Sequence, residues 1–305
     1  MNIMITYVID DLMQSPAKVL VNAVNIAGVM GKGIAYDFKL CYPEMFAQYR
    51  DLCRRSAFDI GQLMLYQTAH KWVLNFPTKQ HWRSSSQVEH IEHGLQTFVA
   101  TYATRGITSA SFPRLGTGAG GLDWERDVRL LMENYLDPLP IAIYIHEYDE
   151  NDPHLPERNI RATRAWLEGT PKPVSFSKFW RDITRLLKSE SKFTTLDGET
   201  RFSVGRDKRR KGHNLVVLVD SAPQPLFLSE SLLVELWLYV RSAGYALTAN
   251  LPGGLDEHAD VMVALLAQLD YVRPVHLVGA DGLTQLGLHY IPPTSRSNDV
   301  PTLSL

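Results

Sequence analysis

The first half of the sequence predicts an α/β fold, in which helices cover both faces of a largely parallel or mixed β-sheet. Three observations predict it. Apolar, β-rich runs alternate along residues 3–148 with segments whose apolar residues recur at helical spacing. The helical segments are long enough to serve as crossover connections between neighbouring strands. Two glycine-rich loops each follow an apolar run and precede a helical segment, as ligand-binding turns of such sheets do.

The elements of this half follow from runs of apolar residues and from the turn residues between them. Strands are expected at residues 3–9, 19–24, 63–68, 72–76, 109–112 and 141–148. Helices are expected at residues 33–42, 43–56, 88–104 and 124–136, and one more at 160–167. The stretch from Gly169 to Pro173 then marks a domain boundary.

The second half differs from the first in its composition and in the pattern of its expected elements. Residues 172–213 are rich in Lys and Arg and include the run from Arg206 to Lys211. Such a run is typical of a solvated linker, and also of a contact with nucleic acid or an acidic partner. Beyond it, strands are expected at 214–219 and 225–228, helices at 229–242 (with Ser229 as N-cap) and 257–269, and a hairpin of 275–278 and 286–290 around Gly279–Gly282.

Two helices followed by a hairpin is the element order of a winged helix. The expected organisation is therefore a first domain over residues 1–168 and a basic linker region over 169–213. A smaller α+β interaction domain, winged-helix-like, follows over 214–305.

Composition and charge exclude several classes of protein. A hydrophobic fraction of 45% with 21% charged residues is typical of a globular protein, not of a disordered or fibrous one. No apolar run reaches the roughly 18–20 residues that span a bilayer, and the N-terminus lacks the pattern of a signal peptide. Cys41 and Cys53 have no partner at metal-ligand spacing, and the histidines form no zinc motif. We expect a cytoplasmic protein without a membrane contact, a metal or a cofactor.

The two glycine-rich loops carry the chemical signal. One runs from Val21 to Ala35 and the other from Phe112 to Trp124. Glycines allow sharp turns and close approach to a ligand, and a helix N-terminus offers free N–H groups to a phosphate. Each loop alone is also consistent with a tight turn, and neither fits the P-loop or the Rossmann fingerprint. Both together, on neighbouring strand ends, are suited to grip a diphosphate from two sides.

Three stretches carry a resemblance to a known family: VNAVNIAGVMGKGIAYDFK, NFPTKQHWRS and FPRLGTGAGGLDW. They resemble the macrodomains and, within them, the DarG-like DNA ADP-ribosyl glycohydrolases, antitoxins that reverse the modification made by DarT-type toxins. The resemblance covers roughly residues 1–155. It implies a three-layer α/β/α domain with a mixed six-stranded sheet and a cleft for ADP-ribose. It also implies a cognate DarT-type toxin as a partner of the C-terminal domain.

The resemblance assigns roles to residues of this sequence. Asp11 matches the acidic residue that accepts a hydrogen bond from the adenine amino group, and Asn25 matches the asparagine near the distal ribose. The expected ADP-ribose-binding residues are Asp11, Leu12, Asn22, Asn25, Gly31, Lys32, Gly33, Ile34, Thr78, Gly116, Thr117, Gly118, Ala119, Gly120, Gly121 and Leu122.

Lys79 matches the lysine that these glycohydrolases place at the anomeric carbon, and it is the expected catalytic residue. A lysine there can attack as a neutral amine, or it can stabilise the leaving group while charged. The alternative is an ordinary surface lysine after a strand. A more distant human relative carries an aspartate where this chain has Gly120, so a lysine–aspartate mechanism is in doubt; Asp123 is expected to cap a helix instead.

His81, Trp82 and Arg83 follow Lys79 directly. An aromatic ring beside a cation suits contacts with DNA by stacking and phosphate pairing. Local packing of Trp82, with Arg83 in solvent, is the alternative.

The leading hypothesis is an ADP-ribosyl glycohydrolase that removes ADP-ribose from modified DNA bases as the antitoxin of a DNA ADP-ribosyltransferase. Two enzymatic alternatives are deacylation and dephosphorylation of small ADP-ribose derivatives, because macrodomains use one cleft for several reactions. A non-catalytic, ADP-ribose-binding interaction or regulatory protein is a further alternative.

Overall fold

The computed structural model describes residues 5–147, 159–278, 282–296 and 302–304. The chain divides into two compact units. Unit 1 comprises Met1–Pro171, Val278–Gly282 and Thr294–Leu305, and unit 2 comprises Lys172–Leu277 and Leu283–Pro293. Most of the turn expected at Gly279–Gly282 lies outside the described residues.

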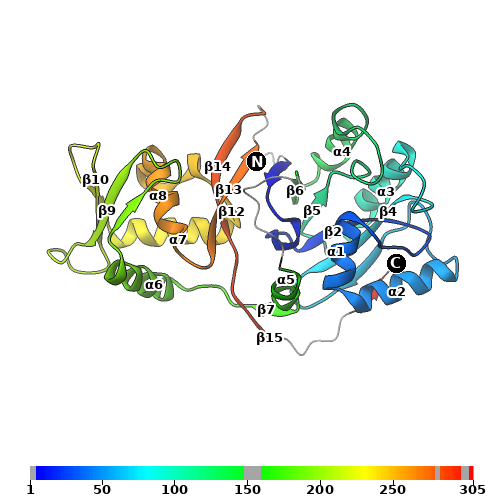
Figure 1. Cartoon of the computed structure of the whole chain (residues 1–305), viewed down its shortest axis with the longest axis horizontal. Coiled ribbons are helices and arrows are strands. Elements are labelled where there is room, and N and C mark those ends of the chain that lie inside the picture. Colours follow the sequence, from blue (N-terminus) through cyan, green and yellow to red (C-terminus); the bar gives the residue numbers. More distant parts are fainter. Residues whose placement is uncertain (1–4, 148–158, 279–281, 297–301, 305) are drawn as a thin grey trace. The chain divides into compact units, whose positions relative to one another are not determined.

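Unit 1 alternates strands with helices, as the sequence predicts (Figure 1). Its strands are β1 (Thr6–Ile9), β2 (Val19–Asn25), β3 (Met64–Gln67), β4 (Trp72–Lys79), β5 (Ser109–Pro113), β6 (Ala142–His146), β7 (Gly169–Pro171), β15 (Thr294–Arg296) and β16 (Thr302–Ser304). Its helices are η1 (Leu12–Gln14), α1 (Gly33–Cys41), α2 (Pro43–Arg54), α3 (Val88–Thr101), η2 (Trp124–Val128), α4 (Arg129–Leu136) and α5 (Ile160–Leu167).

Seven strands of unit 1 lie in a mixed sheet in the order β1-β6-β5-β2-β4-β3-β16, and β7 pairs separately with β15. Strands β1, β6, β5, β2 and β4 run parallel, while β3 and β16 are antiparallel to their neighbours. The six expected strands are all present, but the prediction of a six-stranded sheet is wrong, because the sheet has more strands. The chain returns from unit 2 and adds β16 to β3, with Leu303 opposite Tyr66. A three-residue strand carries no periodicity by which a sequence could reveal it.

Helices cover both faces of this sheet because its buried strands carry apolar residues on both sides. In β2, Val19 and Val21 pack into one core with α3 and α4, whereas Leu20 and Val24 pack into another with α1, α2 and α5. Figure 1 shows α3 and α4 on one side of the sheet and α1, α2 and α5 on the other. The three-layer α/β/α arrangement is therefore confirmed for the N-terminal half.

Unit 2 combines two small antiparallel sheets with three longer helices. Its elements are α6 (Phe176–Ser189), β8 (Lys192–Thr194), β9 (Arg201–Arg206), β10 (Leu215–Val219), β11 (Leu226–Leu228), α7 (Glu230–Ala243), β12 (Tyr245–Leu247), η3 (Thr248–Asn250), η4 (Pro252–His258), α8 (Ala259–Leu266), β13 (Val272–Val278) and β14 (Thr284–Tyr290). Strands β11-β10-β9-β8 form one sheet, and β14 lies between β12 and β13. One core, centred on the fully buried Trp237, joins both sheets to α6, α7 and α8.

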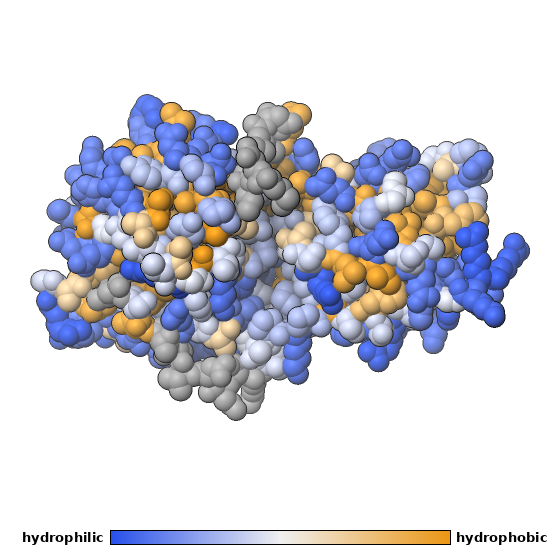
Figure 2. All heavy atoms as spheres, turned by 180° about the vertical axis from the view of Figure 1, so that it is seen from behind, coloured by the Kyte–Doolittle hydropathy of each residue, from blue (hydrophilic) through white to orange (hydrophobic). Residues whose placement is uncertain are grey.

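The range 169–213, expected as a basic linker, contains β7, α6, β8 and β9. Helix α6 buries Phe179, Trp180 and Ile183 against the core of unit 2, so this segment is part of the fold. A winged helix alone does not describe unit 2, because α6 and the sheet β8–β11 precede α7. On the face drawn in Figure 2, hydrophobic patches lie among hydrophilic residues on each unit.

Candidate active site

Three segments leave the same edge of the unit 1 sheet. Strands β5, β2 and β4 are parallel neighbours, so their carboxyl ends lie together, and each is followed by a segment of the predicted site. Strand β2 ends at Asn25, β4 at Lys79 and β5 at Pro113. The two glycine-rich loops therefore leave the neighbouring strand ends of β5 and β2, as the sequence predicts, and β4 ends on the other side of β2.

Asn25 holds the first loop in shape. Its side-chain oxygen accepts hydrogen bonds from the backbone N–H groups of Ala27 (3.0 Å) and Val29 (3.3 Å), and its amide donates to the Val29 carbonyl (2.7 Å). The Tyr49 hydroxyl of α2 donates to the Asn25 carbonyl at 2.5 Å. Asn25 is thus fixed from two sides, and Tyr49 is a supporting residue that no sequence motif indicated.

The first loop leads into the N-terminus of α1. Lys32 occupies the N-cap position in an extended conformation, and its side chain makes no capping hydrogen bond. The first turn of α1 carries no acidic residue, so the N–H groups there stay available to an anion. Gly33, at φ +59°, adopts the left-handed conformation that glycine favours, and Gly31, Lys32 and Gly33 are exposed.

The second loop folds back on itself and packs against the segment after β4. Leu122 N–H donates to the Gly116 carbonyl (3.1 Å), and Ser86 N–H donates to the Gly120 carbonyl (2.8 Å). A Cβ atom at Gly120 would lie 2.2 Å from Gly116 O and 2.3 Å from Ser86 Oγ. Gly120 therefore has no room for any side chain. Ser86, which the sequence did not single out, supports both this loop and Thr78.

Lys79 lies between the two loops. The β2–β4 register shifts at its end, so that Asn25 pairs with Lys79 and not with Thr78. Ile26 N–H donates to the Lys79 carbonyl (3.2 Å), and Lys79 Nζ donates to the Ala119 carbonyl of the second loop (2.8 Å). The Lys79 side chain is largely buried, and this burial lowers its pKa below the ordinary lysine value.

The remaining predicted residues differ in their accessibility. Thr78 is buried, and its hydroxyl accepts a hydrogen bond from Ser86 Oγ at 3.3 Å. Asp11 caps η1 by accepting a hydrogen bond from Met13 N–H at 3.0 Å, and Leu12 packs into the core under α1 and α2. Asn22 is fully buried, and its amide donates to Asn75 Oδ1 at 2.8 Å. The structure therefore buries the side chains of Leu12, Asn22 and Thr78 and does not bring them to the surface.

His81, Trp82 and Arg83 form an exposed group in the turn after β4. The His81 and Trp82 rings lie 5.4 Å apart, and the Arg83 guanidinium lies 4.5 Å from the centre of the Trp82 ring. Trp82 remains 45% exposed, so one face of an aromatic–cation pair is open to solvent. This arrangement is compatible with both alternatives, contact with DNA and local packing of Trp82, and the DNA contact stays a prediction.

Asp123 is the N-cap of η2. Its carboxylate accepts a hydrogen bond from Arg126 N–H at 2.8 Å, as expected of a helix cap. Because Gly120 cannot hold a side chain, no acidic side chain can occupy that position of the loop. Over the residues that the structure describes, no group of three or more His, Cys, Asp or Glu side chains could hold a metal ion.

Part of the chain resembles known proteins. Residues 21–131 match the family model described as "Macro domain". This part of the chain is a macro domain. A DNA ADP-ribosyl glycohydrolase of Mycobacterium tuberculosis is 43% identical over 141 residues, which cover 45% of this chain and 40% of that protein. A fusion protein of Thermosipho africanus, named as a DNA ADP-ribosyl transferase–DNA ADP-ribosyl glycohydrolase, is 34% identical over 155 residues, with coverage of 45% and 40%.

Among solved structures, the macrodomain of Mycobacterium tuberculosis DarG is 41% identical, with a TM-score of 0.45. The match covers 47% of this chain and 97% of that one. The chain spans about two fifths of the length of the curated relatives that it matches. These likenesses concern the macro domain and leave unit 2 without a counterpart among the matches given above.

Proposed function

We propose that this protein is a DNA ADP-ribosyl glycohydrolase, which removes ADP-ribose from a modified DNA base. The observation that carries the proposal is the position of Lys79, a largely buried cation whose Nζ reaches the second glycine-rich loop at Ala119 O. The likeness to DNA ADP-ribosyl glycohydrolases over the macro domain supports the same reaction. A protein that only binds ADP-ribose has no need of a buried lysine between the two loops.

The proposed site binds ADP-ribose across the edge of the sheet. The free N–H groups at the start of α1 and those of the loop Gly116–Leu122 attract the diphosphate. Asp11 accepts a hydrogen bond from the adenine amino group, and Asn25 orients the distal ribose. Gly31 and Ile34 line the cleft. Leu12, Thr78 and Asn22 support it from beneath, Asn22 by fixing Asn75.

Lys79 then acts at the anomeric carbon in one of two ways. As a neutral amine, which its lowered pKa favours, Nζ attacks this carbon while the bond to the base breaks, and water later releases the sugar. As an ammonium, it stabilises negative charge that develops on the leaving base. Borohydride reduction during turnover distinguishes the two, because only the covalent route passes through a Schiff base at Lys79, and a control mixture of the protein with free ADP-ribose measures any adduct formed without turnover.

The test of the reaction is release of ADP-ribose from ADP-ribosylated single-stranded DNA, with Lys79→Ala and the control Lys39→Ala. Lys39 lies in the last turn of α1, where its ammonium sits 4.9 Å from the centre of the Phe46 ring. Release should fall by about two orders of magnitude or more in Lys79→Ala and stay unchanged in Lys39→Ala. Equal release by both variants would refute the assignment of Lys79.

Two alternatives are tested with the same protein. O-acetyl-ADP-ribose and ADP-ribose 1″-phosphate serve as substrates for the deacylase and the phosphatase. If the protein turned over either compound faster than modified DNA, that reaction would replace the proposed one. Tight ADP-ribose binding with no turnover of any of the three would identify a reader.

We also propose that the protein is a cytoplasmic antitoxin whose unit 2 binds a DNA ADP-ribosyltransferase of the DarT type. The fusion of transferase and glycohydrolase in the Thermosipho relative supports such a pairing. In unit 2, the order α7, β12, η3–η4, α8, β13, β14 and the sheet order β12-β14-β13 support a winged-helix-like module as the toxin-binding part. Co-elution of the two proteins in size-exclusion chromatography tests the pairing.

The winged-helix-like module is better suited to contact protein than to read DNA. In α8, which occupies the place of a recognition helix, all six residues from Val261 to Leu266 are buried in the core of unit 2. A helix that reads the major groove needs exposed polar side chains. Over the described residues, no helix is both long and apolar enough to cross a membrane.

A further inference from the structure

The sheet β11-β10-β9-β8 of unit 2 has one buried face and one open face. Phe193, Phe202, Val204 and Val217 point inward and belong to the core of the unit. Because side chains alternate along a strand, the residues between them point outward. The register places Lys192, Ser203 and Leu218 side by side across β8, β9 and β10, and Gly205, Val216 and Phe227 across β9, β10 and β11. We call these six residues, with Arg201, the outer face.

The apolar part of the outer face lies over β10 and β11 and is exposed. Leu218 is 52% exposed and Phe227 is 46% exposed, although both lie in strands. A Cβ atom at Gly205 would meet no atom within 4 Å, so the surface beside Val216 is open and flat. Exposed apolar residues that are contiguous on a sheet mark a binding surface more often than single ones do.

The border of the outer face is basic. Residues 201–211 contain six Lys or Arg residues and one acidic residue, Asp207, in a chain whose net charge is −2. The Arg210 guanidinium lies 4.9 Å from the centre of the Phe227 ring, and it also pairs with Asp207 at 3.4 Å. This places a cation directly against the exposed aromatic ring at the edge of the sheet.

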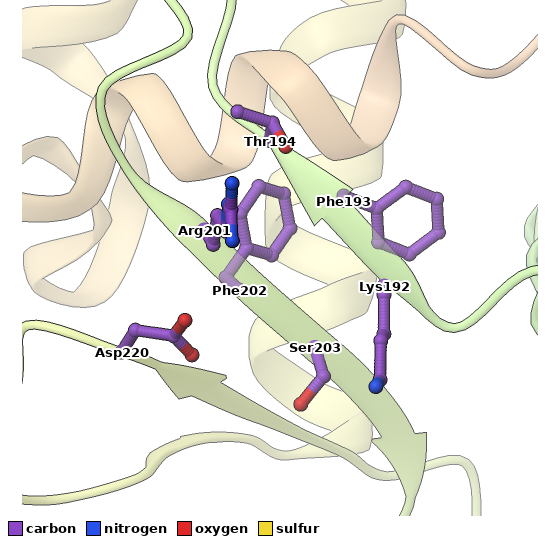
Figure 3. Close-up of a pocket in the computed structure, with 7 residues that line it drawn as sticks. All are labelled: Lys192, Phe193, Thr194, Arg201, Phe202, Ser203 and Asp220. Atoms are coloured by element: carbon purple, nitrogen blue, oxygen red, sulfur yellow. The ribbon is translucent and has the colours of Figure 1, made fainter.

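A hollow of about 290 Å³ lies at the other end of the face, against β8 and β9. Figure 3 shows Lys192, Arg201 and Ser203 among the residues that line it, together with Asp220 at the end of the neighbouring strand. Two cations and a hydroxyl are the groups that hold a phosphate oxygen, and one carboxylate reduces their charge without cancelling it. The basic residues at both ends of the outer face thus attract anions, while its apolar part over β10 and β11 is suited to stacking.

We propose that the outer face of the β8–β11 sheet binds single-stranded nucleic acid. Bases of a single strand are free to stack on Phe227 and to pack on Leu218 and Val216, whereas those of a duplex are hidden in its interior. The basic run Arg206–Lys211 and the hollow at Lys192 and Arg201 hold the backbone. The binding of a single strand to this surface does not depend on the proposed function. The further statement that this strand is the one on which the macro domain acts does rest on the proposed function.

The experiment measures the fluorescence anisotropy of a labelled, unmodified 15-nucleotide oligothymidylate, titrated with the intact protein. An equally long DNA duplex is titrated in parallel. The test variants are Phe227→Ser and Arg210→Ala. The matched controls are Leu130→Ser, an exposed leucine of unit 1, and Arg185→Ala, whose exposed side chain projects from α6. Because Phe227 is 46% exposed and the Arg210 side chain is 58% exposed, thermal melting should show that the two test variants stay folded.

The intact protein should bind the oligonucleotide more tightly than the duplex, with an affinity that falls as salt rises. Each test variant should weaken binding about tenfold, and the controls less than twofold. Arg210→Ala should also reduce the slope of log affinity against log salt by about 0.7. No binding of the oligonucleotide, or equal affinity in variants and controls, would overturn the proposal. Since the probe carries no ADP-ribose, neither result depends on the glycohydrolase activity.

Discussion

At the scale of single residues, the side chains around the candidate site are held by backbone groups of the two loops. Asn25 is fixed by Ala27, Val29 and Tyr49, and Lys79 by the Ala119 carbonyl. The resemblance to macrodomains indicated Asn25 and Lys79. Tyr49 and Ser86 come from α2 and from the segment before α3, and their contacts depend on packing that no local pattern encodes.

Gly120 offers a direct test of how tightly the second loop is packed. Gly120→Ala should lower the free energy of unfolding by about 2 kcal/mol, since its Cβ would collide with Gly116 O and Ser86 Oγ. Urea denaturation measures the change. Gly118→Ala is the matched variant, because a Cβ there meets nothing within 4 Å. A loss of similar size in both variants would show that the crowding at Gly120 is not its cause.

His70 should make unit 1 sensitive to acid. It is buried beside Trp166, its Nδ1 lies 3.0 Å from the Trp166 carbonyl, and burial is the main cause that lowers its pKa to about 4. Unfolding restores an ordinary pKa near 6.5, so the unfolded chain binds more protons between these values and stability falls as pH drops from 6.5 toward 4.

The expected loss of unfolding free energy between pH 7 and pH 5 is about 2 kcal/mol from His70 alone. His70→Gln removes this titration. Between pH 7 and pH 5 the variant should therefore lose about 2 kcal/mol less unfolding free energy than the original chain. Urea denaturation at both pH values provides the comparison. Parallel losses in the two proteins would mean that His70 does not carry the acid sensitivity.

At the scale of elements, periodicity and capping residues predicted most of the long segments. Helices α3, α5 and α7 begin within a residue of their expected starts, and Ser229 is the N-cap of α7, as expected. Helix α6 was missed although Phe176, Phe179, Trp180 and Ile183 recur at helical spacing. The high basic content of this segment favoured a linker over a helix. Strands β8, β12, β15 and β16 span three residues each, too few for an alternating pattern to be recognised.

Ser229→Ala should destabilise unit 2 by about 1 kcal/mol, since Ser229 accepts a hydrogen bond from Leu232 N–H at the start of α7. Ser242→Ala, near the other end of the same helix, should have little effect, because its hydroxyl only donates to Tyr239 O one turn earlier. Chemical denaturation of both variants provides the measurement. If Ser242→Ala proved the more costly of the two, capping would not explain the stability of α7.

At the scale of the whole molecule, the chain forms two units whose sequences interleave. Residues 294–304 return to unit 1, where β15 pairs with β7 and β16 pairs with β3. The sequence indicated the macro domain through three motifs, but nothing in its pattern showed that a distant segment would extend the sheet. Non-local strand pairing is decided by the packed structure and not by local preference.

Removal of residues 294–305 should destabilise unit 1, since it leaves β3 as an unpaired edge and takes away the partner of β7. Thermal melting of the shortened chain should show a lower midpoint and more aggregation than the full chain. Leu303→Ser is the control, because it keeps the backbone pairing of β16. With Leu303 38% exposed, this variant should melt near the full chain. Identical melting of full and shortened chains would contradict the stabilising role of β16.

The central claim is that the macro domain removes ADP-ribose from DNA with Lys79 at the reacting carbon. The most direct test is the single-turnover rate of ADP-ribose release from ADP-ribosylated single-stranded DNA, measured for the intact chain and for Lys79→Ala at saturating protein. We predict release by the intact chain and a rate lower by about two orders of magnitude or more in the variant, with ADP-ribose binding largely retained. Unchanged release by Lys79→Ala, or no release by an intact chain that binds ADP-ribose, would contradict it.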